Sequence, residues 1–253
     1  MAISLASIKR SGAARPPRTI LYGTSGIGKS SFGASAENPI FISTEAGLDA
    51  ISVDAFPLCK SWDEVMECFA TLITEDHAFK TVILDSLDWT ERLIWEQVAK
   101  DNNVKSIENI GYGKGYKEAI SYWRALLDTL DACRDEKGMQ VILLAHSKIK
   151  RFDDPLNDPY DRYMLDLHDG AASILMEWCD IMAFAHYRIS TIKTDAGFNQ
   201  KHTRAVGSGD RVIHTQERPS WVAKSRWSLP DTMPLDYENF ASVLAETMQT
   251  SAQ

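Results

Sequence analysis

Residues 23–30 read G-T-S-G-I-G-K-S, a full match to the phosphate-binding loop pattern G-x-x-x-x-G-K-[ST]. Glycines let the backbone turn tightly, so that its N–H groups point at phosphate oxygens, and a helix that starts there adds the positive end of its dipole. Residues 19–22 form a short β-type run directly before the loop, and residues 30–36 suit the start of a helix. Strand, loop and helix in this order are the context in which the pattern binds a nucleoside triphosphate with Mg²⁺.

The last residues of the loop have separate expected tasks. Lys29 is expected to reach the β- and γ-phosphates, and the hydroxyl of Ser30 to bind Mg²⁺. The residues expected to contact the nucleotide are Gly23, Thr24, Ser25, Gly26, Ile27, Gly28, Lys29, Ser30 and Ser31. The predicted ligands of this chain are therefore ATP and Mg²⁺.

Apolar runs alternate with helical patterns along the rest of the chain. Strand-like runs cover residues 38–43, 81–85, 140–145 and 180–187, and helical spacing covers residues 61–74, 89–100 and 116–130. Such alternation is typical of a mostly parallel sheet covered by helices on both faces. We therefore predict an α/β fold, with a C-terminal β-hairpin (residues 211–214 and 220–223) and a closing helix (residues 237–248). Trp89, Trp95 and Trp123 lie on predicted helices at core-like spacing, so we expect them to be buried.

Polar residues at the ends of predicted strands are candidates for the rest of the site. Asp85 ends the strand T-V-I-L-D and is expected to hold Mg²⁺ beside Ser30. Hydrolysis also needs a group that positions or deprotonates water. Glu45, just after the strand at residues 38–43, is the first candidate for that role, and Asp88 is the second. His146 ends the strand V-I-L-L-A and is expected to sense the γ-phosphate by hydrogen bonding.

Composition favours one folded domain in a reducing compartment. The chain has 253 residues, enough for a single α/β domain, which we place at residues 17–253 after an N-terminal tail or arm at residues 1–16. The four cysteines are far apart and form no C-x-x-C pair, so we expect buried thiols rather than a disulfide or zinc framework. Without a long apolar run at the N-terminus, we expect a cytoplasmic protein with no membrane contact.

The charge balance argues against bulk attraction to nucleic acid. The net charge is −8, from 27 basic and 35 acidic residues. The charge is nevertheless unevenly spread, since residues 201–226 contain six basic and two acidic residues. Local basic surfaces on an acidic body are therefore expected, although chance segregation explains the same pattern.

Three of these segments resemble the RecA-like recombinase core. F-I-S-T-E-A-G at residues 41–47 resembles the family's second-strand segment with its catalytic glutamate, and V-I-L-D-S at residues 82–86 resembles its Walker B strand. L-L-A-H-S at residues 143–147 takes the place of the sensor strand, where RecA itself has glutamine. The resemblance implies a RecA-like P-loop NTPase.

A closer resemblance is to a family of phage-encoded, core-only RecA-like ATP-binding proteins that includes the phage single-strand-annealing proteins. It covers roughly residues 17–230, and further segments that carry it are G-Y-G-K-G-Y at 111–116, Y-D-R-Y at 160–163, E-W-C-D at 177–180 and A-K-S-R at 223–226. It implies ATP binding and hydrolysis, with annealing or recombination of single-stranded DNA in some members. In that setting the chain would act in the cytoplasm of a phage host.

The same resemblance suggests that neighbouring subunits complete the ATP site. Lys224 and Arg226 resemble the K-x-R pair that RadA-like and DnaB-like ATPases insert into the site of an adjacent subunit. Two cations opposite the developing phosphate charge would accelerate hydrolysis. A homo-oligomer, a ring or a filament, is therefore expected; the alternative is a solvated basic strand end.

Residues after His146 are a candidate DNA-binding loop. Lys148, Lys150, Arg151 and Phe152 combine phosphate-binding cations with an aromatic ring that can stack on a base. Asp153 and Asp154 weaken this interpretation, and an ordinary solvated loop is the alternative.

Two functions remain in competition at this point. The first is an ATPase that acts on single-stranded DNA in phage recombination or annealing, working with a single-strand-binding or replication protein. The second is an ATP-gated protein–protein switch, such as a loader or regulator of a replication partner, with no DNA activity of its own. A phosphotransferase is less favoured because no acceptor site stands out in the sequence.

Overall fold

A computed structural model describes residues 15–195 and 201–251 of the chain. The predicted tail at residues 1–16 lies outside this description except for Arg15 and Pro16. The strands are β1 (Arg18–Gly23), β2 (Pro39–Ser43), β3 (Asp54–Ala55), β4 (Thr81–Asp85), β5 (Gln140–Phe152), β6 (Tyr160–Leu165), β7 (Ile181–Asp195), β8 (Lys201–His214), β9 (Lys224–Ser225) and β10 (Thr232–Pro234). The helices are α1 (Lys29–Ala34), α2 (Trp62–Thr74), α3 (Leu87–Asp101), α4 (Lys114–Glu136), α5 (Asp169–Trp178) and α6 (Tyr237–Ser251), with short 3₁₀ turns η2 (Ile107–Asn109) and η3 (Gly111–Gly113).

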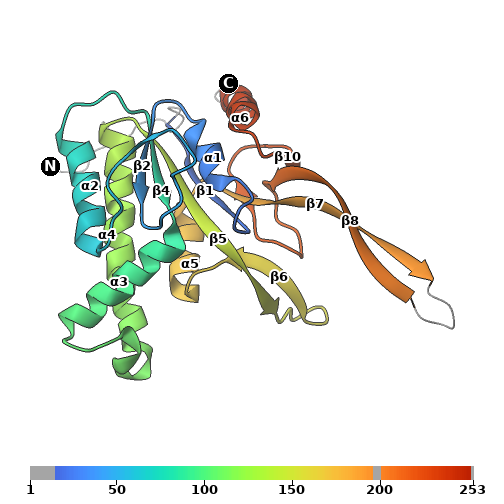
Figure 1. Cartoon of the computed structure of the whole chain (residues 1–253), viewed down its shortest axis with the longest axis horizontal. Helices are drawn as coiled ribbons and strands as arrows, with labels where there is room; N and C mark the ends of the chain where they lie inside the picture. The colour runs from blue at the N-terminus through green and yellow to red at the C-terminus, as the bar shows by residue number, and fades with distance from the viewer. Residues whose placement is uncertain (1–14, 196–200, 252–253) are drawn as a thin grey trace, which may run out of the picture.

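The strands form a mixed, centrally parallel sheet in the order β10-β8-β7-β1-β5-β4-β2-β3 (Figure 1). β1 lies parallel to both β5 and β7, and β4 lies parallel to both β5 and β2. β5 therefore separates the strand that leads into the P-loop from the strand that ends in Asp85. The carboxyl ends of these parallel strands meet at one edge, where an α/β sheet binds its ligands.

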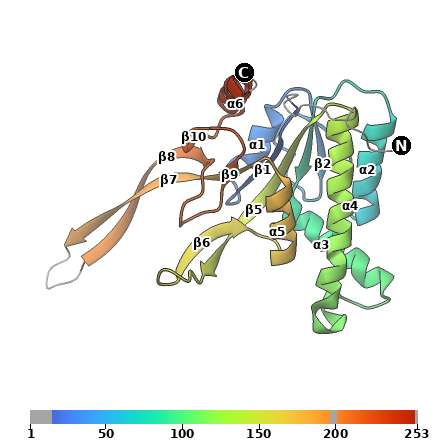
Figure 2. The same ribbon diagram turned by 180° about the vertical axis from the view of Figure 1, so that it is seen from behind.

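Alternate residues of each strand face two separate hydrophobic cores. On β1, Ile20 and Tyr22 face the core formed with α2, α3, α4 and α5, while Leu21 faces the core formed with α1 and α6. Figure 2 shows α4 and α5 in front of the sheet, whereas α1 lies in front in the opposite view of Figure 1. The predicted α/β fold, with helices on both faces of a mostly parallel sheet, is confirmed.

Two hairpins extend the sheet beyond its carboxyl edge (Figures 1 and 2). β5 continues through His146 to Phe152 and pairs antiparallel with β6, from Ser147 opposite Leu165 to Phe152 opposite Tyr160. The expectation of a loop after His146 is therefore wrong: the polar residues belong to a strand whose backbone groups pair with β6. The second hairpin consists of β7 and β8, which pair antiparallel along most of their lengths.

The predicted hairpin between residues 211–214 and 220–223 is not formed. Arg211–His214 is the end of β8, which lies between β7 and β10. The backbone of Val222 is held elsewhere, since its N–H donates to the Tyr22 hydroxyl at 3.1 Å and that hydroxyl donates to the Val222 carbonyl at 2.6 Å. Residues 220–223 are therefore bound across the sheet by tertiary contacts. The predicted closing helix is confirmed as α6.

The tryptophans differ in their burial. Trp123 is fully buried and Trp95 packs against the same core, as expected. Trp89 is 38% exposed, and the Arg92 guanidinium lies 4.2 Å from the centre of its ring. The expectation that Trp89 is a core residue is therefore wrong, because its face of α3 points outward. Within the described residues, no helix is both long and apolar enough to cross a membrane.

Candidate nucleotide-binding site

The loop between β1 and α1 has the conformation that its glycines were expected to allow. Gly28 has a φ of 108° and Gly26 a φ of 74°, in the left-handed region that disfavours side chains. A Cβ at Gly23 would lie 2.2 Å from the Ala185 carbonyl oxygen of β7, so only glycine permits this close approach. The loop is therefore a backbone cradle at the carboxyl edge of the sheet, directly before helix α1.

Lys29 and Ser30 lie at the positions where a nucleotide's charge is expected. The Lys29 ammonium is buried and donates to the carbonyl oxygens of Gly23 and Thr24, at 3.2 Å and 3.1 Å. Burial lowers the pKa of Lys29 although Asp85 and Glu45 lie near enough to oppose that shift. A buried cation held only by neutral carbonyls is available to anionic phosphate oxygens.

The two predicted magnesium ligands come together in the structure. The Ser30 hydroxyl donates to the Asp85 carboxylate at 2.6 Å, across the gap between α1 and the end of β4. Burial raises the pKa of Asp85, which a bound cation would reverse. A hydroxyl and a carboxylate are hard oxygen donors of the type that Mg²⁺ prefers. The residues present therefore fit a magnesium ion beside the P-loop.

The turn that carries Glu45 is tied to the end of β4. The Thr44 N–H donates to the Asp85 carbonyl at 2.8 Å. The Thr44 hydroxyl donates to the Ser86 carbonyl at 2.9 Å and accepts from the Ser86 N–H at 3.1 Å. These bonds hold Glu45 at the same edge as Asp85 and Lys29. Burial raises the pKa of Glu45, with Asp85 adding to this effect, which makes its carboxylate a stronger base.

Asp88, on the first turn of α3, is bonded to His146. Its carboxylate accepts the His146 backbone N–H at 3.0 Å and lies 3.0 Å from the ring Nδ1. The bond to Asp88 raises the pKa of His146. Burial alone would raise the pKa of Asp88, but its hydrogen bonds from His146 outweigh burial and lower it. Asp88 thus orients His146.

Glu45, Asp88 and His146 form one compact polar group. One potential ligand atom from each lies within 4.8 Å of the others. Since the Asp88 carboxylate is held by His146, the half-buried Glu45 is the carboxylate available to water. The geometry therefore ranks Glu45 ahead of Asp88 as the candidate base.

Arg211 is a residue of the site that sequence reasoning did not single out. From β8, its guanidinium reaches the P-loop: a Cβ at Gly28 would lie 2.6 Å from its Nη1 atom, which also lies 3.4 Å from the Ile27 carbonyl oxygen. The basic composition of residues 201–226 was the one available signal. It could not identify Arg211, because the approach depends on how β8 is placed beside β7 and β1.

The candidate DNA-binding residues lie on β5 and pair with acids. The Lys150 ammonium lies 2.6 Å from the Asp169 carboxylate, and the Lys148 ammonium lies 3.7 Å from the Asp166 carboxylate. Arg151 lies beside Asp153. The Phe152 ring is covered by the Arg162 guanidinium. The structure therefore places the predicted residues together on one strand, with much of their charge locally balanced.

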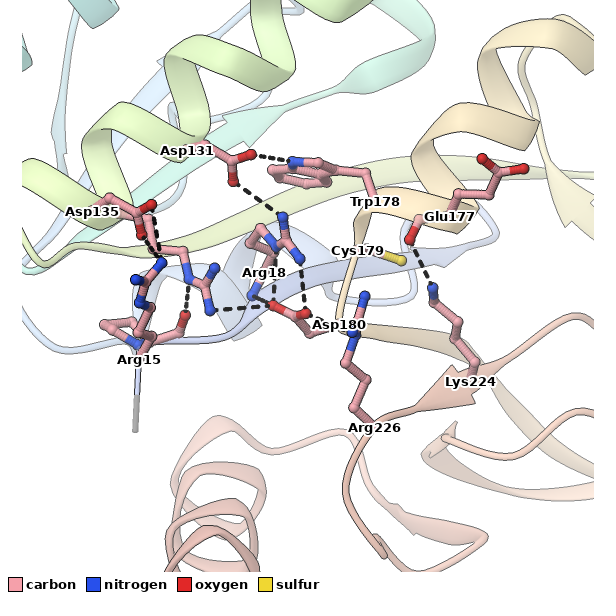
Figure 3. Close-up of polar contacts among 12 residues, drawn as sticks. Arg15, Arg18, Asp131, Asp135, Glu177, Trp178, Cys179, Asp180, Lys224 and Arg226 are labelled. Carbon is pink, nitrogen blue, oxygen red and sulfur yellow. Dashed lines mark hydrogen bonds and ion pairs between the residues drawn. The ribbon is translucent and has the colours of Figure 1, made fainter. Parts of the chain in front are cut away.

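Figure 3 shows Lys224 and Arg226 beside Glu177 and Asp180. They lie at the opposite end of the sheet from their own P-loop. β9 pairs with β7 at Ile181 and Met182, beside the start of β1, whereas Gly23 lies at the end of β1. The Lys224 ammonium donates to the Glu177 carbonyl at 3.4 Å, and Arg226 lies 3.0 Å from Asp180. These cations are therefore not part of the P-loop site of their own chain.

A P-loop at the carboxyl edge of an α/β sheet, with a serine and an aspartate paired beside it, defines a nucleotide-binding NTPase site. The family described as an AAA domain matches residues 15–227, and the chain belongs to that family. No curated protein matches the chain. Among solved structures, the crystal structure of the RadB recombinase is similar over 83% of this chain and 86% of that chain, with 16% identity and a TM-score of 0.43.

Proposed function

We propose that the chain is a Mg²⁺-dependent ATPase whose nucleotide state is transmitted to the β5–β6 hairpin. Lys29 and the loop amides would bind the phosphates, and Ser30 with Asp85 would hold the metal, which supplies charge neutralisation at the phosphates. Glu45 would accept a proton from water as that water forms a bond to the γ-phosphorus. The bond between the γ-phosphorus and the bridging oxygen then breaks, and ADP and phosphate leave.

One observation carries the proposed coupling: β5 runs without interruption from His146 into the hairpin. With Nδ1 committed to Asp88, Nε2 is the ring atom that can reach a phosphate oxygen or the attacking water. A shift of His146 would move a paired strand, because Ser147 to Phe152 are bonded to β6. Hydrogen-bonded strands are one of the rigid elements that can carry such a shift from one site to another.

The proposed ligand of the hairpin is single-stranded DNA, in recombination or annealing of the phage type. Lys148, Lys150 and Arg151 offer phosphate contacts, and Phe152 offers a stacking surface. Their acid partners are mostly exposed, and such pairs are worth only about 0–1 kcal/mol, so phosphates can compete for the cations.

The proposed assembly is a homo-oligomer in which Lys224 and Arg226 face the ATP site of a neighbour. Their placement supports this assembly, because they lie at the amino ends of the central strands and the P-loop of the same chain lies at the carboxyl ends. In the assembly, the exposed Arg226 guanidinium would leave its ion pair with Asp180 and bind the phosphates of the neighbour's ATP.

A second candidate function is an ATP-gated protein contact. It is favoured by exposed apolar side chains on the two hairpins: Ile149 and Leu156 near β5 and β6, and Tyr187 and Ile189 on β7. The acid partners of Lys148 and Lys150 also lower the net positive charge that DNA would meet.

Steady-state ATP hydrolysis with and without single-stranded DNA tests the proposal. Stimulation by DNA should disappear in a triple variant in which Lys148, Lys150 and Arg151 are alanine, while basal hydrolysis stays. Lys29→Ala is the control that should abolish both. Hydrolysis that DNA leaves unchanged, in a protein that also fails to retain DNA with ATP bound, would favour the protein switch.

A further inference from the structure

Two cysteines that are separated in the sequence meet in the structure. The Sγ atoms of Cys59, in the segment before α2, and Cys68, on α2, lie 3.7 Å apart. Cys133 and Cys179 are also free thiols and are buried at other places in the same core. These sulfur atoms must approach by less than about 2 Å to reach the bonding distance of about 2 Å, through side-chain rotation together with a shift of the segment that carries Cys59.

The pair opens onto a cleft of about 280 Å³ on the surface. Cys59 is 3% exposed, whereas Cys68 is only partly buried. The cleft lining includes two carboxylates, Glu64 and Glu67, and no basic residue. A small neutral oxidant can therefore enter, while an anionic disulfide such as oxidised glutathione meets like charge.

The two thiols differ in chemical character. The Cys59 thiol, hydrogen-bonded to Cys68, lowers the pKa of Cys68, against the opposing effect of burial. The same contact, together with burial, raises the pKa of Cys59. Cys68 is therefore the sulfur that ionises more readily to a thiolate and is the more accessible of the two, and Cys59 is its buried partner.

We propose that Cys68 and Cys59 form an oxidation site for hydrogen peroxide. The Cys68 thiol loses its proton to solvent, the thiolate attacks one peroxide oxygen, and the O–O bond breaks; Cys68 becomes a sulfenic acid, and the hydroxide that leaves takes up a proton to become the first water. Cys59 sulfur then attacks the Cys68 sulfur, the S–O bond of the sulfenic acid breaks, and the Cys59 proton passes to the leaving hydroxyl, which departs as the second water. Both sulfurs are oxidised to one intrachain disulfide, and one peroxide is reduced to two waters.

The site is connected to the turn that carries Glu45. The Cys59 N–H donates to the carbonyl of Ser43, the last residue of β2, at 2.9 Å. Glu45 follows two residues later. A disulfide to α2 would pull on this bond, and misplacing a catalytic group by about 1 Å can cost on the order of 10²-fold in rate. This coupling rests on the proposed function, whereas the oxidation itself does not.

Mass spectrometry of the full chain after treatment with hydrogen peroxide tests the oxidation. We expect loss of two hydrogens, a link between the peptides that contain Cys59 and Cys68, and full reversal by dithiothreitol. Cys68→Ser and Cys59→Ser should each abolish the link, and Cys133→Ser and Cys179→Ser should retain it. Oxidation of Cys68 to sulfinic acid without a link, a link between chains, or faster reaction with oxidised glutathione would overturn the proposal.

ATP hydrolysis by the same samples tests the coupling separately. We expect the oxidised protein to lose about tenfold or more in rate, to recover on reduction, and Cys68→Ser to be insensitive to peroxide. A linked protein with an unchanged rate would overturn the coupling. If reduced protein has no hydrolytic activity, the proposed function fails, while the mass spectrum still decides on the thiol pair.

Discussion

Asp88 binds His146 twice, through the backbone N–H at 3.0 Å and the ring Nδ1 at 3.0 Å. The backbone bond anchors α3 to the point where β5 leaves the body of the sheet, and the ring bond sets the tautomer and direction of the imidazole. A carboxylate used in this way acts through the histidine, as second partners of functional histidines commonly do.

Asp88→Asn is expected to lower the pKa of His146, because the bond that raises it loses its charge. ATP hydrolysis should fall by at least about tenfold, because a His146 ring that Asp88 no longer orients would not reach the phosphate or the attacking water in the productive geometry. The pKa is measured by imidazole NMR titration, with Asp128→Asn, on α4, as the control. An unchanged His146 pKa would contradict the geometry.

Lys29→Met should abolish the thermal stabilisation that ATP confers while leaving the melting temperature of the free protein close to its original value. In the free protein Lys29 is a buried cation with a lowered pKa, so an apolar side chain of similar length costs little there. Differential scanning fluorimetry with and without ATP makes the comparison. Lys100→Ala, at a side chain that is 70% exposed, is the control that should keep the ATP-induced shift.

Replacing Asp180 by alanine should lower the free energy of unfolding more than most single substitutions in this chain. Its 5% exposed side chain lies 2.9 Å from Arg18, 3.7 Å from Arg134 and 3.0 Å from Arg226 (Figure 3). Asp180→Ala should reduce the free energy of unfolding by about 3–5 kcal/mol, because buried arginine charge loses its partner. Arg226→Ala, at a side chain that is 58% exposed, should cost at most about 1 kcal/mol. Urea titrations give both values, and equal losses would refute the difference in burial as their cause.

Because Arg226→Ala should cost little stability, its effect on hydrolysis can distinguish a structural ion pair with Asp180 from a contribution to a neighbour's ATP site. If it completes a neighbour's ATP site, Arg226→Ala should lower hydrolysis while the fold stays intact. Mixing Arg226→Ala with Lys29→Ala should then restore part of the activity, because some interfaces would pair an intact P-loop with an intact arginine. No restoration in the mixture would count against a contribution from the neighbour.

Glu91 should make stability fall as the pH rises toward neutrality. Burial raises its pKa to about 7, against the opposing bond from the His168 N–H. Since the folded-state pKa lies above the unfolded value, the contribution of Glu91 is fully present below the unfolded pKa, near 4.5, and is lost as pH rises through about 7. The loss is at most about 3 kcal/mol.

Glu91→Gln should remove this pH dependence, because glutamine can still accept the His168 N–H but does not ionise. The test is the free energy of unfolding at several pH values between about 5 and 8. A slope that is the same in the variant and the original protein would exclude Glu91 as its source. Asp63→Asn, at an exposed carboxylate, should leave the slope unchanged.

Patterns that depend on neighbouring residues were predictable from sequence. The P-loop is a local conformation set by glycines, and Asp85 follows a continuous apolar run, so its place at the carboxyl edge required only a parallel sheet. Trp62–Thr74 became a helix with Ser61 as its N-cap because its apolar spacing and its cap are both local. The alternation of strands and helices was enough to predict the layers.

Partnerships across the sheet were not predictable in this way. The strand character of Lys148–Phe152 depends on backbone pairing with β6, and polar side chains on both of its faces concealed it. The position of Arg211 against Gly28 depends on β8 lying two strands from β1. The pairing of Cys59 with Cys68 depends on how the segment beside β2 packs on α2.

The sequence by itself therefore determined the nucleotide-binding loop, the α/β class and the residues at the strand ends, because backbone geometry and hydrophobic periodicity act over a few neighbouring positions. Only the tertiary structure decided that Asp88 orients His146, that β5 continues into a hairpin, and that Lys224 and Arg226 lie away from their own P-loop. Those relationships join residues far apart in the chain, and they arise from strand order and from the burial of charges that must find partners.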